Sequence, residues 1–236
     1  MHSHVLSAPV RSPRSERSTS ADARPDGSEL ELRTVGTIDE ARGHRFAFQR
    51  KDTLYHDGDA ASSLYRVRSG LVRITRMTPE GRLLTVRHVM PGDVFGEEAF
   101  AGGRREETAE ALTDAEIESI EPTRIGGDDL REVTYSLSQQ MQRLIDYGYH
   151  LQTGDLRQRV ARYLLTLAAT PLALQDDDGR RRIAATHELL AEGTGSTRES
   201  VSKIIHELRT EGLIASGYRN VTILDEEQLE EVAHGF

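Results

Sequence analysis

The sequence predicts a protein of the α+β class, with an antiparallel β-sheet domain first, a long helix next, and a small domain of short helices and strands last. Three observations carry this prediction. Residues 32–125 consist of short runs in which apolar and polar residues alternate between turn signals. Residues 130–151 then show apolar residues spaced three and four apart. Finally, residues 186–214 contain two short helical patterns joined by a glycine-containing turn.

Length and composition limit the kind of protein this chain can be. Its 236 residues leave room for one large domain or two small ones. No run approaches the ~18 apolar residues that a membrane-spanning helix needs. The N-terminus lacks the apolar core of a secretory signal, so we expect a cytoplasmic location and no membrane partner. The chain has no cysteine, which excludes disulfides, iron–sulfur clusters and cysteine-ligated zinc.

The charge balance is acidic. The formal net charge is −9 at pH 7, and residues 155–236 alone carry ten Lys and Arg against fourteen Asp and Glu. A nucleic-acid interface in such a chain has to come from a local basic face and from helix N-termini. Residues 1–28 are rich in Ser, Arg, Pro and Ala. They are predicted to be a disordered tail, because they cannot bury enough apolar surface to fold.

Residues 29–128 are predicted to form the β domain. Alternation typical of strands is clear in residues 71–75 and 83–87, and turn-forming prolines and glycines punctuate the chain at 79–81 and 91–93. No helical pattern lies between the strand-like runs. The pattern therefore favours an antiparallel sandwich or barrel.

The order of four short motifs in this domain carries a resemblance to a known family. The motifs are D-G-D at 57–59, L-Y-R-V-R-S-G-L-V-R-I at 64–74, E-G-R at 80–82 and P-G-D-V-F-G-E at 91–97. In this order they resemble the cyclic-nucleotide-binding jelly roll of the CRP/FNR family of bacterial transcription regulators. The resemblance covers roughly residues 54–224. It implies a homodimer that binds double-stranded DNA and works with RNA polymerase.

A long helix is predicted over residues 129–154. Its apolar positions follow a 4-3-4-3-4-3 spacing, which is the a/d seam of a coiled coil. A seam this narrow is typical of two copies of one helix packed together, and a core helix within one chain is the alternative. The resemblance implies that this helix forms the homodimer interface. The seam consists of Leu130, Thr134, Leu137, Met141, Leu144, Gly148 and Leu151.

Residues 155–236 are predicted to form a winged helix-turn-helix domain. Thr186 is the expected N-cap of a first short helix, and two glycines end that helix. Ser196 and Glu199 have the spacing of a capping box that would start a second helix. A hairpin with its turn at 178–179 precedes the two helices, and strand-like residues follow them.

The second of these helices has an apolar side and a polar side. The apolar side repeats at i, i+3, i+4 and i+7 and consists of Val201, Ile204, Ile205 and Leu208. Arg198 and Lys203 fall on the opposite side. A helix of this kind suits insertion into a DNA major groove. An ordinary amphipathic surface helix would show the same pattern.

The resemblance assigns base contacts within this second helix. Arg198, Glu199 and Lys203 match the family's R-E-x-x-x-R pattern, with lysine in the last place. Arg198 would donate to guanine O6 and N7, and Glu199 would accept from cytosine N4. The implied operator is a palindrome of TGTGA and its inverse repeat. The predicted DNA-binding residues are Thr186, Ser196, Thr197, Arg198, Glu199, Ser202 and Lys203.

The effector pocket of the resembled family lies between the jelly roll and the long helix. Its phosphate-binding segment starts at P-G-D-x-x-G-E, of which Gly96 and Glu97 are retained. The segment ends in an Arg-Ser or Arg-Thr pair, and an ungapped count puts Glu107 and Thr108 there. A carboxylate would repel a phosphodiester that a guanidinium would pair with. The arginines at 104–105 could substitute if the loop is shifted.

The polar pair that meets adenine in the family falls at Leu144 and Ile145, which are both apolar. Two contacts to a cyclic nucleotide are therefore missing. We expect no cofactor and no binding of cAMP. Either another small-molecule effector is used, or the protein binds DNA without one.

Enzyme and metal-site hypotheses find little support. His187 and Glu188 begin an H-E-x-x-H motif, but Ala191 stands where the second histidine would be. The histidines of the β domain are scattered over different segments, whereas a metal-binding barrel needs them clustered. The remaining alternative is a sensor or adaptor whose jelly-roll domain binds a ligand or a protein without acting through DNA.

Overall fold

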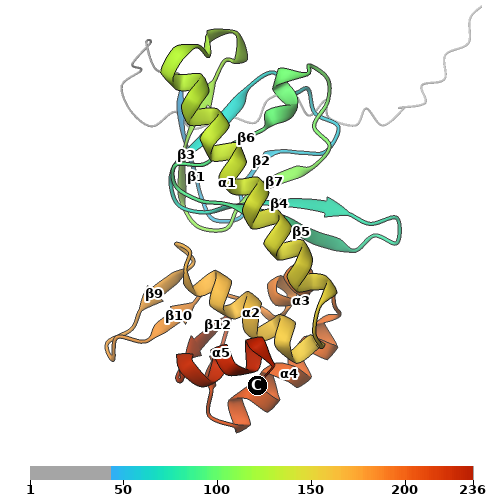
Figure 1. Cartoon of the computed structure of the whole chain (residues 1–236), viewed down its shortest axis with the longest axis vertical. Coiled ribbons are helices and arrows are strands. Elements are labelled where there is room, and N and C mark those ends of the chain that lie inside the picture. Colours follow the sequence, from blue (N-terminus) through green and yellow to red (C-terminus); the bar gives the residue numbers. More distant parts are fainter. Residues whose placement is uncertain (1–43, 236) are drawn as a thin grey trace, which may run out of the picture. The chain divides into compact units, whose positions relative to one another are not determined.

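The computed structural model describes residues 44–235 (Figure 1). The predicted tail at 1–28 lies outside these residues. The predicted α+β architecture is confirmed, because a β sandwich and a long helix are followed by a helical domain with a small sheet. Among the described residues, no helix combines the length and the apolar character that crossing a membrane requires.

Two four-stranded sheets make up the N-terminal domain, and every strand pair in them is antiparallel. The first sheet has the order β1-β8-β3-β6, with β1 at Arg45–Phe48, β8 at Ala115–Ile120, β3 at Leu64–Ser69 and β6 at Val94–Phe95. The second has the order β2-β7-β4-β5, with β2 at Thr53–Tyr55, β7 at Thr108–Ala111, β4 at Val72–Met77 and β5 at Leu83–Val89.

Side chains from both sheets form the core of this domain. In β7 the burial alternates, with Ala109 and Ala111 buried and their neighbours partly exposed, as expected for a strand with one face on a core. The turn between β3 and β4 requires glycine at Gly70, because φ is +83° and a Cβ would overlap the backbone of Asp114. The shared core includes Phe48, Val67, Val72, Ile74, Phe95 and Ile117.

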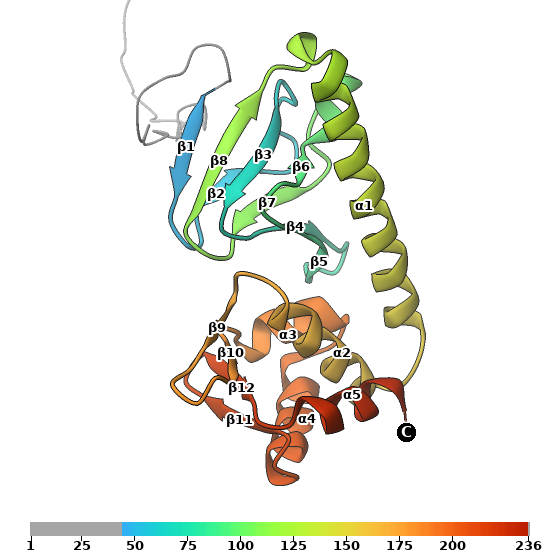
Figure 2. The ribbon, with the colours of Figure 1, turned by 60° about the vertical axis from the view of Figure 1, so that its left-hand side comes forward.

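A loop and a long helix follow β6. The loop begins at Gly96, forms the short 3-10 helix η1 (Glu97–Phe100) and reaches β7 at Thr108. After β8 and the 3-10 turn η2 (Pro122–Arg124), the helix α1 spans Gly127–Gln152. Figures 1 and 2 both show α1, in green to yellow, beside β6.

The C-terminal domain combines helices with a four-stranded antiparallel sheet of order β11-β12-β10-β9. The hairpin predicted around residues 178–179 is confirmed, since β9 pairs with β10. Its helices are α2 (Leu156–Ala168), α3 (His187–Thr194), α4 (Arg198–Thr210) and α5 (Glu226–His234). Its strands are β9 (Ala173–Gln175), β10 (Arg181–Ile183), β11 (Ile214–Gly217) and β12 (Asn220–Ile223).

The helix starts agree with the prediction at α3 and differ from it at α4. Thr186 is the N-cap of α3, where its hydroxyl oxygen accepts from the Leu189 N–H at 3.1 Å. The cap of α4 is Thr197 and not Ser196, so the predicted capping box was wrong. The physical reason is that the Ser196 N–H already closes α3 by donating to the Ala191 carbonyl at 3.0 Å. Ser196 therefore belongs to the end of α3, and α4 begins one residue later.

Candidate functional site

Helix α4 presents one buried face and one solvent face, as its sequence predicts. Val201 and Leu208 are fully buried and Ile205 is nearly so. Arg198, Glu199 and Lys203 are exposed. The helix is thus held by its apolar side, while two cations and a carboxylate near its N-terminus remain accessible to a ligand.

Of the two glycines predicted to end the first helix, only Gly195 does so, because α3 continues through Gly193 to Thr194. Gly195 adopts the left-handed conformation at φ +62°, which ends α3 and redirects the chain into α4. Gly193 lies directly under the ring of Tyr163 from α2, and a Cβ at this position would overlap the ring. This close approach fixes α3 against α2. Helix α3 is therefore held in place by packing inside the C-terminal domain.

The hydroxyl residues predicted to bind DNA are distributed over both helices of the motif and the turn between them. Thr186 and Thr197 cap α3 and α4 with their side-chain oxygens. Ser202 lies on α4 with its hydroxyl 2.8 Å from Nδ1 of His187. Burial, followed by the nearby Arg198 guanidinium, lowers the pKa of His187 below its ordinary value. This lowered pKa favours the neutral form of the His187 imidazole.

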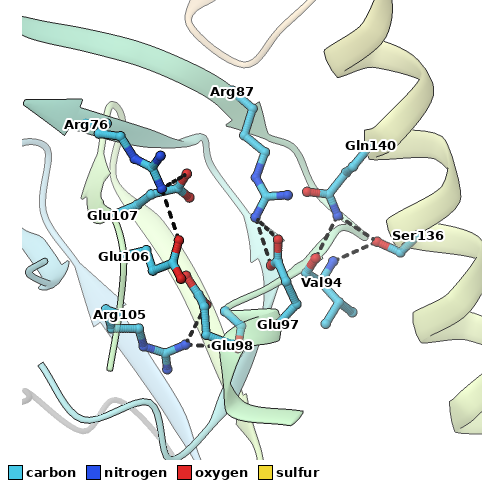
Figure 3. Close-up of polar contacts among 11 residues, drawn as sticks. Arg76, Arg87, Val94, Glu97, Glu98, Arg105, Glu106, Glu107, Ser136 and Gln140 are labelled. Carbon is cyan, nitrogen blue, oxygen red and sulfur yellow. Dashed lines mark hydrogen bonds and ion pairs between the residues drawn. The ribbon is translucent and has the colours of Figure 1, made fainter. Parts of the chain in front are cut away.

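Ion pairs hold the loop that would bind an effector (Figure 3). Gly96 begins it with φ +79°, and a Cβ there would lie 2.7 Å from Nη1 of Arg105. Both carboxylate oxygens of Glu97 accept from Nη2 of Arg87 on β5, at 2.6 and 2.8 Å. The first acidic side chain of the loop is thus paired with an arginine of the neighbouring sheet.

Arg105 turns into the protein interior. Its guanidinium donates to the carbonyl oxygens of Gly96 at 2.9 Å and Ser63 at 2.5 Å, and it pairs with Glu98 at 3.2 Å. The group also lies over the ring of Tyr55, 4.3 Å from its centre. Only 1% of the Arg105 side chain is exposed. Its donors are therefore directed at protein atoms and not at a ligand.

Glu107 lies at the far end of this loop, immediately before β7. Its carboxylate is 3.5 Å from Nη2 of Arg76, which also pairs with Glu106 at 3.3 Å. Burial raises the pKa of Glu107 above its ordinary value, and nearby arginines partly offset this effect. The next residue, Thr108, accepts from the Asp57 N–H at 3.1 Å. The structure thus places Gly96, Glu97 and Glu107 on one loop and Thr108 at the start of β7, and the charged groups of the loop pair with one another and with the sheet.

The two pocket candidates on α1 have different surroundings. Leu144 is 37% exposed and lines an open pocket of about 440 Å³ between the β4–β5 hairpin and α1. Ile145 is 58% exposed and is not among the residues lining that pocket. Neither side chain brings a polar group toward the loop.

Ser136 and Gln140, which the sequence analysis did not single out, hold the strand that leads into the loop. The Val94 N–H donates to the Ser136 hydroxyl at 2.8 Å, and the Gln140 amide donates to the Val94 carbonyl at 2.6 Å (Figure 3). Their signal in the sequence is two polar residues four apart on α1, on a side of the helix that lies next to the seam.

Comparison with known proteins finds a matching family model for each half of the chain. A family model described as the cyclic nucleotide-binding domain matches residues 45–126, and one described as the Crp-like helix-turn-helix domain matches residues 158–232. The transcriptional regulator LdrP of Thermus thermophilus is 50% identical over 186 residues, which cover 79% of this chain and 95% of LdrP. The chain belongs to the CRP/FNR family of transcription regulators.

Two further comparisons agree with CRP/FNR membership. The transcriptional regulator SdrP of the same organism is 39% identical over 189 residues, covering 79% of this chain and 93% of SdrP. The crystal structure of a CRP-family transcriptional regulator, also from Thermus thermophilus, superposes with a TM-score of 0.78 at 49% identity. That match covers 80% of this chain and 96% of the other.

Membership of the CRP/FNR family defines the role of the site in general terms. The protein is a DNA-binding transcription regulator and not an enzyme, and it binds DNA through the helix-turn-helix domain. Within the described residues, no group of three or more His, Asp and Glu side chains is arranged to hold a metal ion.

Proposed function

We propose that this regulator is a cytoplasmic homodimer that binds a palindromic, TGTGA-like operator without cAMP and acts with RNA polymerase. The observation that carries this proposal is that the acidic side chains of residues 96–107, which we call the effector loop, form ion pairs with arginines of the same domain. Glu97, Glu98 and Glu107 each have an arginine partner within the β domain. The loop is therefore held by ion pairs within the β domain, and the arginines that could attract a ligand anion are already paired with glutamates.

The charge of the loop argues against a cyclic nucleotide. Glu107 stands where the family resemblance places the phosphate-binding arginine, and its carboxylate is 17% exposed. A phosphodiester entering there would lose the bidentate contact and meet like charge instead. Arg105 does not supply the missing contact, because its guanidinium is already bound to Gly96, Ser63 and Glu98. Arg104 donates to the Gly58 carbonyl at 2.6 Å.

The exposed apolar face of α1 supports a homodimer. Leu130 and Met141 of the predicted seam are 50% and 60% exposed in the single chain, and Leu144 is 37% exposed. Large apolar side chains in this number along one helix are costly to leave in water. A second copy of the same helix would cover them by a two-fold contact, as the heptad spacing predicts.

The accessible face of α4 supports direct reading of bases. Arg198 can donate two hydrogen bonds to guanine, and Glu199 can accept from cytosine. Lys203 lacks the planar fork of the arginine that the family resemblance places there, so selectivity at its base should be lower. In a homodimer, two such helices would read half-sites about one turn of DNA apart, ~34 Å.

The alternative of a sensor or adaptor that does not act through DNA has lost its basis. It required the helix-turn-helix pattern to be an ordinary amphipathic surface helix. The Crp-like helix-turn-helix model matches residues 158–232, and the face of α4 that reads DNA in such domains is exposed here.

Selection of bound duplexes from a random pool, with no nucleotide added, tests the proposal. We expect a two-fold symmetric consensus related to TGTGA, recovered by the purified protein alone. Recovery of an asymmetric consensus would contradict the homodimer. Recovery only after cAMP is added would contradict effector independence. A matched selection with Arg198→Ala should lose preference at one guanine in each half-site.

A further inference from the structure

Helix α1 has a second stripe of side chains, distinct from its apolar seam. The buried residues of α1 are Val133, Ser136 and Gln140, and two of these three are polar. Ser136 is 6% exposed and Gln140 is 2% exposed. Buried polar side chains are costly unless they are hydrogen-bonded, so their partners indicate why they are there.

Both polar side chains bind the same backbone unit. Val94 donates its N–H to the Ser136 hydroxyl at 2.8 Å and accepts at its carbonyl from the Gln140 amide at 2.6 Å. The Gln140 amide nitrogen also lies 3.1 Å from the Ser136 hydroxyl, which joins the two side chains. Figure 3 shows the two side chains reaching from α1 to Val94. We call Ser136, Gln140 and Val94 the α1–β6 clamp.

The clamp provides hydrogen-bond partners for the backbone of an edge strand. Strand β6 is the last strand of the β1-β8-β3-β6 sheet, and it pairs with β3 on one side only. An edge strand leaves backbone donors and acceptors without strand partners. Here the side chains of α1 supply those partners for Val94. A rotation of α1 by one residue, about 100°, would break both hydrogen bonds.

A third contact lies on the same stripe. Arg143 donates to the carboxylate of Asp93 at 2.5 Å, one residue before Val94. Ser136, Gln140 and Arg143 are spaced i, i+4, i+7, so they lie along one line of the helix. This line attaches α1 to the chain just before Gly96, where the effector loop begins.

We propose that Ser136 and Gln140 are positioning residues that set the rotation of α1 on the β domain without a ligand. The inference rests on the proposed function, in which the protein binds DNA as a homodimer without cAMP. The rotation of α1 decides which residues face the second copy. With the clamp in place, the seam residue Met141 is 60% exposed and is presented for pairing. Without the clamp, α1 could rotate, and residues next to the seam would also face the second copy.

The test compares a variant that lacks the clamp with a matched control on the same helix. The variant is Ser136→Ala with Gln140→Met, and the control is Ser138→Ala with Gln139→Met. Residues 138 and 139 are exposed neighbours of the same types. The first measurement is amide hydrogen exchange in β6 and α1. We expect exchange about tenfold faster or more without the clamp and no change in the control. If the double variant does not fold, Ser136→Ala alone is measured against Ser138→Ala.

The second measurement reads the rotation of α1 directly. The chain contains no cysteine, so Met141→Cys and Gln142→Cys can be introduced singly and cross-linked by mild oxidation. Both positions are exposed in the single chain, and only Met141 belongs to the seam. With the clamp intact, Met141→Cys should cross-link far more than Gln142→Cys. Without the clamp, that ratio should fall about tenfold. A loss of stability alone would lower both yields together and leave their ratio unchanged.

The outcomes separate this inference from the proposed function. Unchanged exchange in β6 and α1 would overturn the clamp. Faster exchange with an unchanged cross-linking ratio would mean that Ser136 and Gln140 stabilise the contact between α1 and β6 without setting the rotation of α1. That result would also overturn the inference. If neither cysteine cross-links in the intact protein, the proposed dimer fails. The clamp is then judged by exchange alone, in which faster exchange confined to β6 and α1 supports it.

Discussion

The Arg105 guanidinium lies 4.3 Å from the centre of the Tyr55 ring, inside the β domain. This relationship ties the end of the effector loop to strand β2 through a side chain of the loop. A buried guanidinium requires several partners, and Arg105 has them in two carbonyl oxygens, one carboxylate and an aromatic face. Arg105 therefore fixes the loop to the interior of the β domain.

Replacement of Arg105 should destabilise the β domain strongly. Arg105→Met keeps much of the side-chain volume but leaves the carbonyls of Gly96 and Ser63 and the carboxylate of Glu98 without their donor. We expect a loss of ~3–5 kcal/mol in the free energy of unfolding, measured by urea denaturation. Arg104→Met, at the exposed neighbour with one hydrogen bond to Gly58, should cost roughly 1 kcal/mol or less. Equal effects of the two variants would refute the assignment of Arg105.

Leu144→Glu should convert the dimer into a monomer. The substitution would place like charges on both sides of a two-fold axis, where neither has a partner. Light scattering coupled to size exclusion would measure the mass. Gln139→Glu adds the same charge at an exposed position away from the seam and should leave the dimer intact. A Leu144→Glu protein that still elutes as a dimer would mean that α1 is not the interface.

Arg198→Ala should weaken operator binding by about 1–3 kcal/mol per half-site and relax the preference at one guanine. The loss should be specific to sequence, because a bidentate contact to guanine is removed. Arg209→Ala, in the last turn of the same helix, is the control and should leave the preference unchanged. Fluorescence anisotropy on operators with single base changes would measure both. Equal weakening on all sequences would mean that Arg198 contacts phosphate only.

Glu107→Gln should change how stability depends on pH. Burial raises the pKa of Glu107 above its ordinary value of 4.5, so the folded protein binds this proton more tightly than the unfolded chain does. The stabilisation that follows is complete below pH 4.5 and is lost as the pH rises through the folded-state pKa. The advantage of Gln over Glu should therefore be larger at pH 7 than at pH 4, as measured by thermal unfolding. The opposite trend would mean that Arg76 and Arg87 outweigh burial.

The fold could be predicted because its signals are local and ordered. Alternation in 71–75 and 83–87 anticipated β4 and β5, and the apolar stripe of Val201 and Leu208 anticipated α4. The start of α4 was missed by one residue. Its cap depends on a bond between Ser196 and Ala191 across the preceding turn, and residue preferences at a single position do not contain that information.

The interior of the candidate site was harder to predict. The direction of Arg105 depends on Tyr55, which is 50 positions earlier and on another strand, so an ungapped count along the loop could not reveal it. The heptad spacing of α1 was assigned to one face, whereas Ser136 and Gln140 lie on another. A helix that contacts a sheet on one side and a second copy on the other carries two overlapping patterns, and the apolar one is easier to recognise.

Operator affinity measured with and without millimolar cAMP tests the central claim most directly. The selected operator duplex is titrated with the purified homodimer at fixed salt, and Glu107→Arg is titrated alongside it. Because the glutamates of the loop are paired with arginines of the β domain, we predict the same dissociation constant in both conditions, within about twofold. Glu107→Arg should gain cAMP affinity if the loop is aligned as we infer. A gain of about tenfold or more in the operator affinity of the wild-type protein on adding cAMP, equivalent to ~1.4 kcal/mol, would contradict effector independence.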